Sequence, residues 1–177
     1  PSEDGIFRVT TLSRTHPVKR LERLLILLKE LEIYCKFTIH YFHIGYGEEL
    51  YNLKKLSEEL KFKKFKIYFK GNLSSYELKK FFKKTPCDAF LNVSTSEGTS
   101  MALIESLSYS IPAIVTNVGG NKKIGKYLET LLHVDYSSQD LNFYFEKLYF
   151  NQEYMKKLRE LSYIYWDINH NEEKIKD

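Results

Sequence analysis

The residues best suited to chemistry lie in one polar stretch, Ser94 to Glu105, which is rich in Ser, Thr and Gly and contains two glutamates. We expect a helix to begin at about Ser100, so that Glu97 lies just before it and Glu105 lies about 12 Å further along its axis. Carboxylates that flank a single bond in glycoside hydrolases stand about 5 to 10 Å apart, so these two do not suit action on one atom. Their spacing suits a long ligand that lies along the start of the helix.

Each glutamate has an expected contact on such a ligand. Glu105 is placed to accept hydrogen bonds from ribose hydroxyls, and Glu97 to meet a sugar at the other end. Between them, the backbone amides of Thr99 and Ser100 open a helix, where free N–H groups and the helix dipole favour phosphate. For Glu105 the alternative is a carboxylate that the helix dipole alone satisfies.

A cationic loop follows the first apolar segment of the chain. Arg14 and Lys19 lie there between the end of an expected strand and the start of an expected helix. A guanidinium makes bidentate contacts to phosphate oxygens and lysine adds a mobile point charge, so both suit a diphosphate. Lys19 has an alternative partner in Glu22, three residues further along the helix surface.

Glycines after two other strands give weaker signals. Gly45 and Gly47 lack the third glycine of a dinucleotide fingerprint, and a tight turn explains both. Gly71 either allows the backbone to approach a nucleobase closely or simply turns the chain, and the sequence does not favour one over the other.

Strand-like and helix-like segments alternate along the whole chain. This alternation predicts a doubly wound α/β fold, a mostly parallel sheet with helices on both faces and functional loops at the carboxyl ends of the strands. No repeat or linker divides residues 1–177, so we expect a single domain. The expected strands are 6–12, 37–44, 65–69, 89–93, 113–116 and 131–134; the expected helices are 18–31, 48–60, 75–85 with a Ser74–Glu77 capping box, 100–108, 138–148 and 151–166, before a weakly docked helical tail at 169–177.

Composition narrows the class of protein. The chain is 43% hydrophobic and 28% charged, as in soluble globular proteins. Cys35 and Cys87 show no ligand spacing, which argues against a zinc site and fits a reducing compartment. No apolar run approaches the roughly 20 residues of a membrane-spanning helix. These features predict a cytoplasmic location.

The net charge of +4 comes largely from lysines between Lys54 and Lys70, where aromatic residues are interleaved. We favour a solvated helix edge that runs into a buried strand, because the aromatics fall where a strand core needs them. Contact with nucleic acid or with a lipid surface is the alternative. Of these two, peripheral contact with the inner face of the membrane is kept as an expectation, and no nucleic-acid partner is expected.

The combination of these motifs resembles the retaining family 4 (group 1) glycosyltransferases of the GT-B fold. The glutamates Glu97 and Glu105 match the E-x7-E region of the family, and Arg14 with Lys19 matches its diphosphate clamp. The resemblance spans nearly the whole chain and covers only the C-terminal, donor-binding domain of that family. Further matching positions are Gly45, Gly71, Pro86 to Asp88, Ile111-Pro112, Thr116 to Gly120 and Trp166.

The resemblance implies a role for each site residue. Arg14, Lys19 and Glu97 are expected to be catalytic, with Glu97 at the donor sugar. The sugar nucleotide is expected to contact Gly71, Gly98, Thr99, Ser100, Met101 and Glu105.

Three departures from the family pattern bear on this assignment. Tyr46 stands where the family usually has an acid, Thr99 and Ser100 where it has an aromatic and a glycine, and Ser110 where it has a glycine. Thr99 and Ser100 still offer backbone amides to phosphate, so the departures affect the shape of the sugar pocket. No D-x-D sequence occurs, in agreement with the metal independence of the family, and no metal or other cofactor is expected.

The sequence therefore predicts one half of a glycosyltransferase. The expected donor is a UDP-sugar or GDP-sugar, and the expected acceptor is a glycan or lipid-linked molecule held by an N-terminal domain absent from this chain. The expected process is cell-surface polysaccharide synthesis in a bacterium. A sugar-nucleotide epimerase of the same two-domain plan and a non-catalytic nucleotide- or anion-binding module are the alternatives.

Overall fold

The chain forms an open sheet of six strands in the order β3-β2-β1-β4-β5-β6. The computed structural model describes residues 4–171. Every strand pairing is parallel, so the predicted doubly wound α/β fold is confirmed. Because the strands all run the same way, their carboxyl ends meet at a single edge of the sheet. The strands are β1 (Ile6–Leu12), β2 (Thr38–Ile44), β3 (Lys66–Phe69), β4 (Ala89–Asn92), β5 (Ala113–Thr116) and β6 (Leu131–Leu132).

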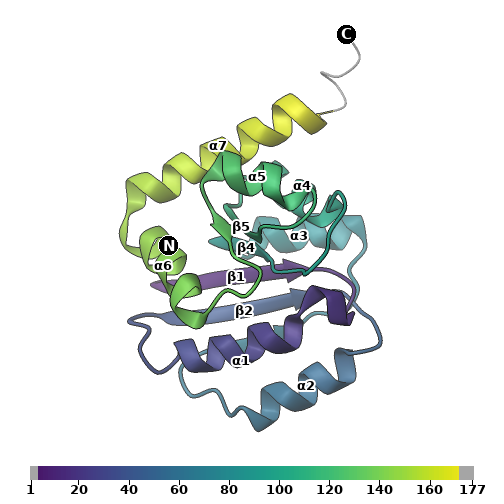
Figure 1. Cartoon of the computed structure of the whole chain (residues 1–177), viewed down its shortest axis with the longest axis vertical. Helices are drawn as coiled ribbons and strands as arrows, with labels where there is room; N and C mark the ends of the chain where they lie inside the picture. Colours follow the sequence, from purple (N-terminus) through teal and green to yellow (C-terminus); the bar gives the residue numbers. More distant parts are fainter. Residues whose placement is uncertain (1–3, 172–177) are drawn as a thin grey trace.

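Helices cover both faces of the sheet (Figure 1). Helices α1 and α2 lie on one face and α3, α4 and α5 on the other, while α7 packs against α4 and α5. The strand order reverses between β1 and β4, and right-handed crossovers on either side of that point send the helices to opposite faces. The helices are α1 (Leu21–Leu31), α2 (Leu50–Glu59), α3 (Ser75–Lys84), α4 (Met101–Ser108), α5 (Asn121–Leu128), α6 (Ser138–Phe150) and α7 (Gln152–His170).

The core forms where α1 packs on the central strands. Leucines at helical spacing, including Leu24 and Leu28, are fully buried on one face of α1, and Phe7 and Val9 of β1 are fully buried beside them. Burial of each such side chain contributes roughly 1.5–3 kcal/mol. This packing fixes where the loop between β1 and α1 lies relative to the sheet.

The start of α1 differs from the prediction. Pro17–Lys19 forms a short 3-10 turn, and Arg20 adopts φ 51°, so the helix begins at Leu21 rather than at Val18. The left-handed Arg20 separates the 3-10 turn from α1, so Lys19 lies in the connection between β1 and α1. The capping box at Ser74 and Glu77 is confirmed.

One helix, α5, was not predicted from the sequence. Its middle contains Gly125, and glycine disfavours a helix interior. The structure gives the reason for that glycine: a Cβ added there would lie 2.5 Å from Leu131 Cδ1 and 2.7 Å from Val115 Cγ2. Close packing on β5 and β6 therefore outweighs local helix preference. Of the predicted tail, Asn169 and His170 belong to α7, and residues 172–177 lie outside the described residues.

Candidate functional site

Lys19 and Glu97 meet at the carboxyl edge of the sheet, towards which the arrowheads of β1 and β2 point in Figure 1. The Lys19 Nζ atom lies 2.6 Å from Glu97 Oε2, and the two side chains are 21% and 12% exposed. The loops that carry them are also joined through the backbone, since Thr95 N donates to Val18 O at 2.9 Å. Lys19 therefore pairs with the predicted sugar-contacting acid and not with Glu22, which was the alternative partner.

Polar side chains at the end of β4 and in the loop after it hold the Glu97 carboxylate. Ser94 Oγ donates to Glu97 Oε2 at 2.9 Å, and Asn92 Nδ2 lies 3.4 Å from the same oxygen. Burial disfavours the charged carboxylate, but the hydrogen bonds from Lys19, Ser94 and Asn92 outweigh it and lower the pKa of Glu97. Glu97 is thus held as a carboxylate in one orientation.

Asn92 and Ser94 belong to this candidate site, and the sequence analysis did not single them out. The amide of Asn92 also donates to Ser100 Oγ at 2.9 Å, so one side chain links the end of β4, Glu97 and the start of α4. The available signal was their position, because they are polar residues at the end of an apolar strand of a parallel sheet.

The loop after β5 fixes the same turn from the other side. Gly120 N donates to Gly98 O at 3.1 Å. Gly119 has φ 42°, and a Cβ added to it would lie 1.6 Å from the Glu97 carbonyl oxygen. No side chain fits between these two backbones, so the loop that carries Glu97 is clamped between the loops after β1 and β5.

The start of α4 is open at this edge. Gly98 and Thr99 are exposed, and a Cβ added to Gly98 meets nothing within 4 Å. Ser100 is the N-cap, accepting a hydrogen bond from Leu103 N at 3.3 Å, and Met101 is 70% exposed. The first turn of a helix carries free N–H groups and a partial positive charge, so this end suits an anion.

Glu105 lies further along α4 and is the second acid of the predicted pair. Its side chain is half-buried, and among residues 4–171 its carboxylate has no hydrogen-bond or ion-pair partner. Burial raises its pKa. A half-buried carboxylate without a protein donor can accept hydrogen bonds from a ligand hydroxyl.

Arg14 and Gly71 lie on the same edge of the sheet but are not drawn into the Glu97 network. Arg14 is exposed in the loop after β1 and pairs with no acid in the part of the chain that is described. Gly71 follows β3, with φ 69°, and its carbonyl accepts from Gly45 N at 2.7 Å. A Cβ added to Gly71 meets nothing within 4 Å, so its backbone borders open space.

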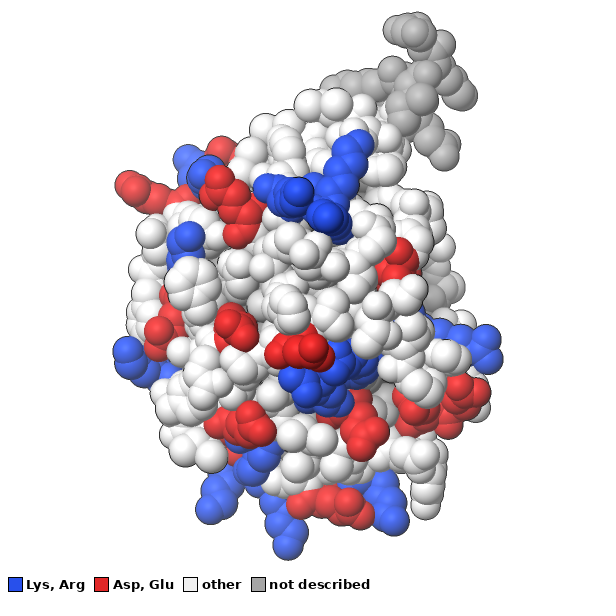
Figure 2. Space-filling model, viewed as in Figure 1, with Lys and Arg blue, Asp and Glu red and all other residues white. Residues whose placement is uncertain are grey.

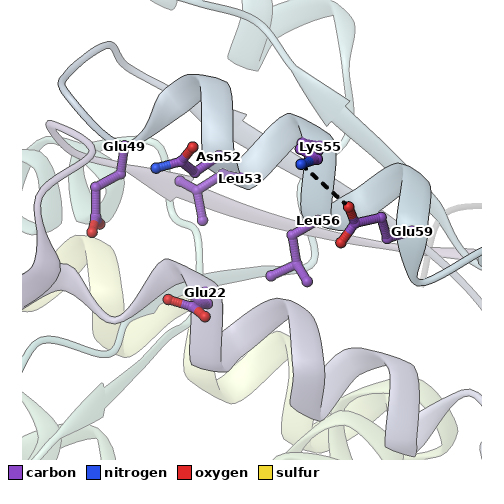
Figure 3. Close-up of a pocket in the computed structure, with 7 residues that line it drawn as sticks. All are labelled: Glu22, Glu49, Asn52, Leu53, Lys55, Leu56 and Glu59. Carbon is purple, nitrogen blue, oxygen red and sulfur yellow. Dashed lines mark ion pairs between the residues drawn. The ribbon is translucent and has the colours of Figure 1, made fainter.

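Two hollows of the surface differ in where they lie relative to this network: one lies away from it, and the other begins at its edge. A cavity of about 330 Å³ between α1 and α2 is lined by Glu22, Glu49 and Glu59 with Lys55 as its only cation (Figure 3). Three carboxylates disfavour a diphosphate there. A second cavity, of about 260 Å³, begins at Thr99 and Ser100 and extends between α4, α5 and α7.

Two further features of the described residues concern metal binding and membrane insertion. Among residues 4–171, no group of three or more His, Cys, Asp or Glu side chains is arranged to hold a metal ion. In the same part of the chain, no helix combines the length and apolar character needed to cross a bilayer.

Solved structures similar to this chain include bacterial glycosyltransferases. The catalytic domain of the cholesterol-alpha-glucosyltransferase of Helicobacter pylori matches with a TM-score of 0.76 at 18% identity, covering 93% of this chain and 99% of that one. The C-terminal domain of a glycosyl transferase group 1 family protein (LpcC) from Francisella tularensis gives a TM-score of 0.76 at 16% identity, covering 94% and 87%.

A larger structure shows how much of a whole enzyme this chain spans. HepE of Anabaena, solved in complex with UDP-glucose, matches with a TM-score of 0.78 at 16% identity. The match covers 93% of this chain and 45% of HepE, so the chain spans less than half of that protein. Among proteins of curated function, no sequence relative matches.

The sequence itself matches a family model. The model described as "Glycosyl transferases group 1" covers residues 3–163, which is most of the chain. The matched region contains the whole Lys19–Glu97 network and Glu105. The chain belongs to the glycosyl transferases group 1 family.

Proposed function

We propose that this chain is the donor-binding domain of a retaining glycosyltransferase. It holds a nucleoside-diphosphate sugar, with UDP or GDP as the nucleotide, at the carboxyl edge of its sheet. A second domain outside this chain holds a glycan or lipid-linked acceptor for cell-surface polysaccharide synthesis in the cytoplasm of a bacterium. The partial coverage of HepE and the UDP-glucose bound in that protein support the proposal.

The contact between Lys19 and Glu97 is the observation that carries it. It brings a cation suited to phosphate and an acid suited to sugar hydroxyls together in front of the open start of α4. A lysine ammonium has three donors, and one is used by Glu97. Lys19 can therefore keep this contact while it donates to a phosphate oxygen.

The roles of the remaining residues follow from their places. The amides of Gly98 to Met101 receive the diphosphate with the help of the helix dipole, and exposed Arg14 closes on it from the loop after β1. Glu105 accepts from the ribose hydroxyls, and the backbone at Gly71 borders the base. As the glycosidic bond breaks, negative charge grows on the diphosphate, and these fixed donors stabilise it without a metal ion.

Thermal unfolding with added nucleotides tests the proposal. UDP, GDP and ADP and their sugars are added to the chain at millimolar concentration, and we expect one nucleotide series to raise Tm, because a ligand that binds only the native state stabilises it. The same ligand should shift Tm less in Glu105→Ala. No response to any of the nucleotides would overturn the proposal.

A further inference from the structure

The outer side of α3 carries four lysines that form no ion pair with any residue from 4 to 171. Its inner side packs into the molecule, with Leu78 buried, Phe81 against Phe42 of β2, and Phe82 against Tyr109. At about 100° per residue, the exposed side then presents four lysines with a tyrosine among them. We call this the basic face of α3, which consists of Tyr76, Lys79, Lys80, Lys83 and Lys84.

Helix α2 also carries neighbouring lysines, but acidic residues of the same helix balance their charge. Both helices contain a Leu-Lys-Lys sequence, but in α2 acids follow four residues later, and Lys55 Nζ lies 3.8 Å from Glu59 Oε1 (Figure 3). In α3 the residues four positions after Lys79 and Lys80 are again lysines. Like charges at this spacing destabilise a helix, whereas opposite charges stabilise it.

No ion pair among the described residues engages the basic face, and Glu77 acts on Lys80 only at longer range. Among residues 4–171, none of its lysines lies within 4.0 Å of a carboxylate oxygen. The one acid of α3, Glu77, is engaged at the N-cap, where it accepts from Ser74 N at 2.8 Å and from Ser74 Oγ at 2.7 Å. On the face of the molecule drawn in Figure 2, by contrast, basic and acidic side chains are interspersed.

The lysine-rich stretch that the sequence analysis singled out is a different surface. Phe65 within it is buried, Lys64 Nζ donates to Cys35 O, and the backbone N–H groups of Lys63 and Lys64 donate to Glu32. The Lys64 side chain and the backbone of Lys63 and Lys64 therefore serve local structure, which distinguishes this stretch from the basic face of α3.

We propose that the basic face of α3 docks on an anionic lipid surface. Lysine ammoniums are mobile point charges that suit a plane of phosphate headgroups, and each adds to the attraction within a Debye length. Tyr76, 75% exposed, has the amphipathic ring that favours a membrane interface. The face has neither the arginines nor the stacked aromatic platform typical of nucleic-acid binding.

The placement of α3 gives the docked orientation. Its first turn follows the carboxyl end of β3 through a short connection, so Tyr76 lies towards the edge of the sheet that carries Lys19 and Glu97. Since the apolar side of α3 is occupied by Phe81 and Phe82, the helix does not insert, and binding is electrostatic and reversible.

Vesicle flotation with matched variants tests this surface. The chain is mixed with neutral vesicles of phosphatidylcholine or with anionic vesicles that also contain about 30 mol% phosphatidylglycerol. Both mixtures are tested at low and at high salt. We expect binding only to the anionic vesicles at low salt. Lys80→Gln with Lys83→Gln should weaken it by about 30-fold, the effect of two interfacial lysines. The control, Lys54→Gln with Lys55→Gln on α2, removes the same charge and should change binding by less than about twofold.

The remaining outcomes separate this proposal from its competitors. Equal losses in both variants, equal binding to neutral vesicles, or no binding to anionic vesicles would overturn it. The proposal would also be overturned if DNA displaced the chain from anionic vesicles and the α3 variant, but not the α2 variant, lost its binding to DNA. The Tm of each variant shows that it is folded, because exposed lysine substitutions cost little stability. The nucleotide response should be unchanged in the α3 variant, so the donor site and the lipid surface succeed or fail independently.

Discussion

Glu97 and Glu105 belong to one loop and helix, yet their surroundings are opposite. Glu97 is held by Lys19, Ser94 and Asn92, and its pKa is lowered. Glu105 has no partner among residues 4–171, and burial raises its pKa. The protein itself therefore organises the Glu97 end of the candidate site. At the other end, the half-buried and unpaired Glu105 carboxylate lowers stability, and hydrogen bonds from a ligand would offset that loss.

This difference predicts different roles for the two ends: the Glu97 end positions the reacting part of a ligand, and the Glu105 end contributes to ligand affinity. Preorganised groups stabilise a transition state because they do not have to reorient as charge develops. A half-buried carboxylate that lacks donors gains more from a ligand hydroxyl than one that is already satisfied. We expect substitutions at the Glu97 end to affect stability and turnover, and substitutions at Glu105 to affect binding.

The largest effect should come from breaking the clamp at Gly119. Gly119→Ala places a Cβ against the Glu97 carbonyl at a positive φ, so the loop must move. We expect a loss of about 3 kcal/mol in the free energy of unfolding, measured by denaturant titration. Gly98→Ala is the matched control, since its Cβ meets nothing within 4 Å. Equal stability of the two variants would show that the Glu97 end is not fixed by this contact.

Lys19→Ala should have the next largest effect, on chemistry. In the whole protein that contains this chain, we expect turnover to fall at least about 100-fold, because a fixed donor to the leaving diphosphate is lost. Arg14→Ala should act in the same direction. Lys36→Ala is the control, because that lysine is exposed and pairs only with Glu146 at 3.5 Å. Near-wild-type turnover in both site variants would remove the diphosphate assignment.

Glu105→Gln should weaken nucleoside-diphosphate binding by about tenfold, the cost of replacing a charged acceptor of ribose hydrogen bonds. Calorimetry of the chain measures this directly. The same substitution should raise Tm at neutral pH, because it removes the burial of an unpaired charge. If binding is unaffected while Tm rises, Glu105 has no ligand role.

The smallest effect is a difference in pH dependence between the two glutamates. Glu97→Gln should lower Tm at pH 7, and the gap should persist at pH 4.5, the ordinary value of a Glu, closing only as pH falls through the lowered pKa. For Glu105→Gln the gain in Tm should shrink from above pH 4.5 downwards, because the raised pKa lets the native state bind a proton first. Thermal scans from pH 7 to about pH 3 check both signs.

The sequence predicted the sheet and most of the polar residues at its carboxyl edge, but not which of these residues contact one another. Apolar periodicity located α1 and the strands, because burial follows period, and Ser74 with Glu77 located a helix start. Helix α5 was missed because Gly125 is explained only by its packing on β5 and β6.

Contacts between distant residues were the other limit. The pairing of Lys19 with Glu97 joins residues 78 positions apart, whereas local spacing offered only Glu22 as an alternative partner. The position of Asn92 at the end of an apolar strand indicated a place at the functional edge, but not its contacts with Glu97 and Ser100. The roles of Arg14, Gly71 and the other donor-contacting residues stay predictions.

The crowding at Gly119 also limits how this site can change. No residue larger than glycine fits beside the Glu97 carbonyl, so the acid cannot be repositioned by substitution from the β5 side. Gly98, by contrast, faces free space, and Thr99 beside it is exposed. Under the proposed function, we therefore expect variation in the sugar contacts on the outward side of the turn, and a library that aims to change the donor should begin at Gly98 and Thr99.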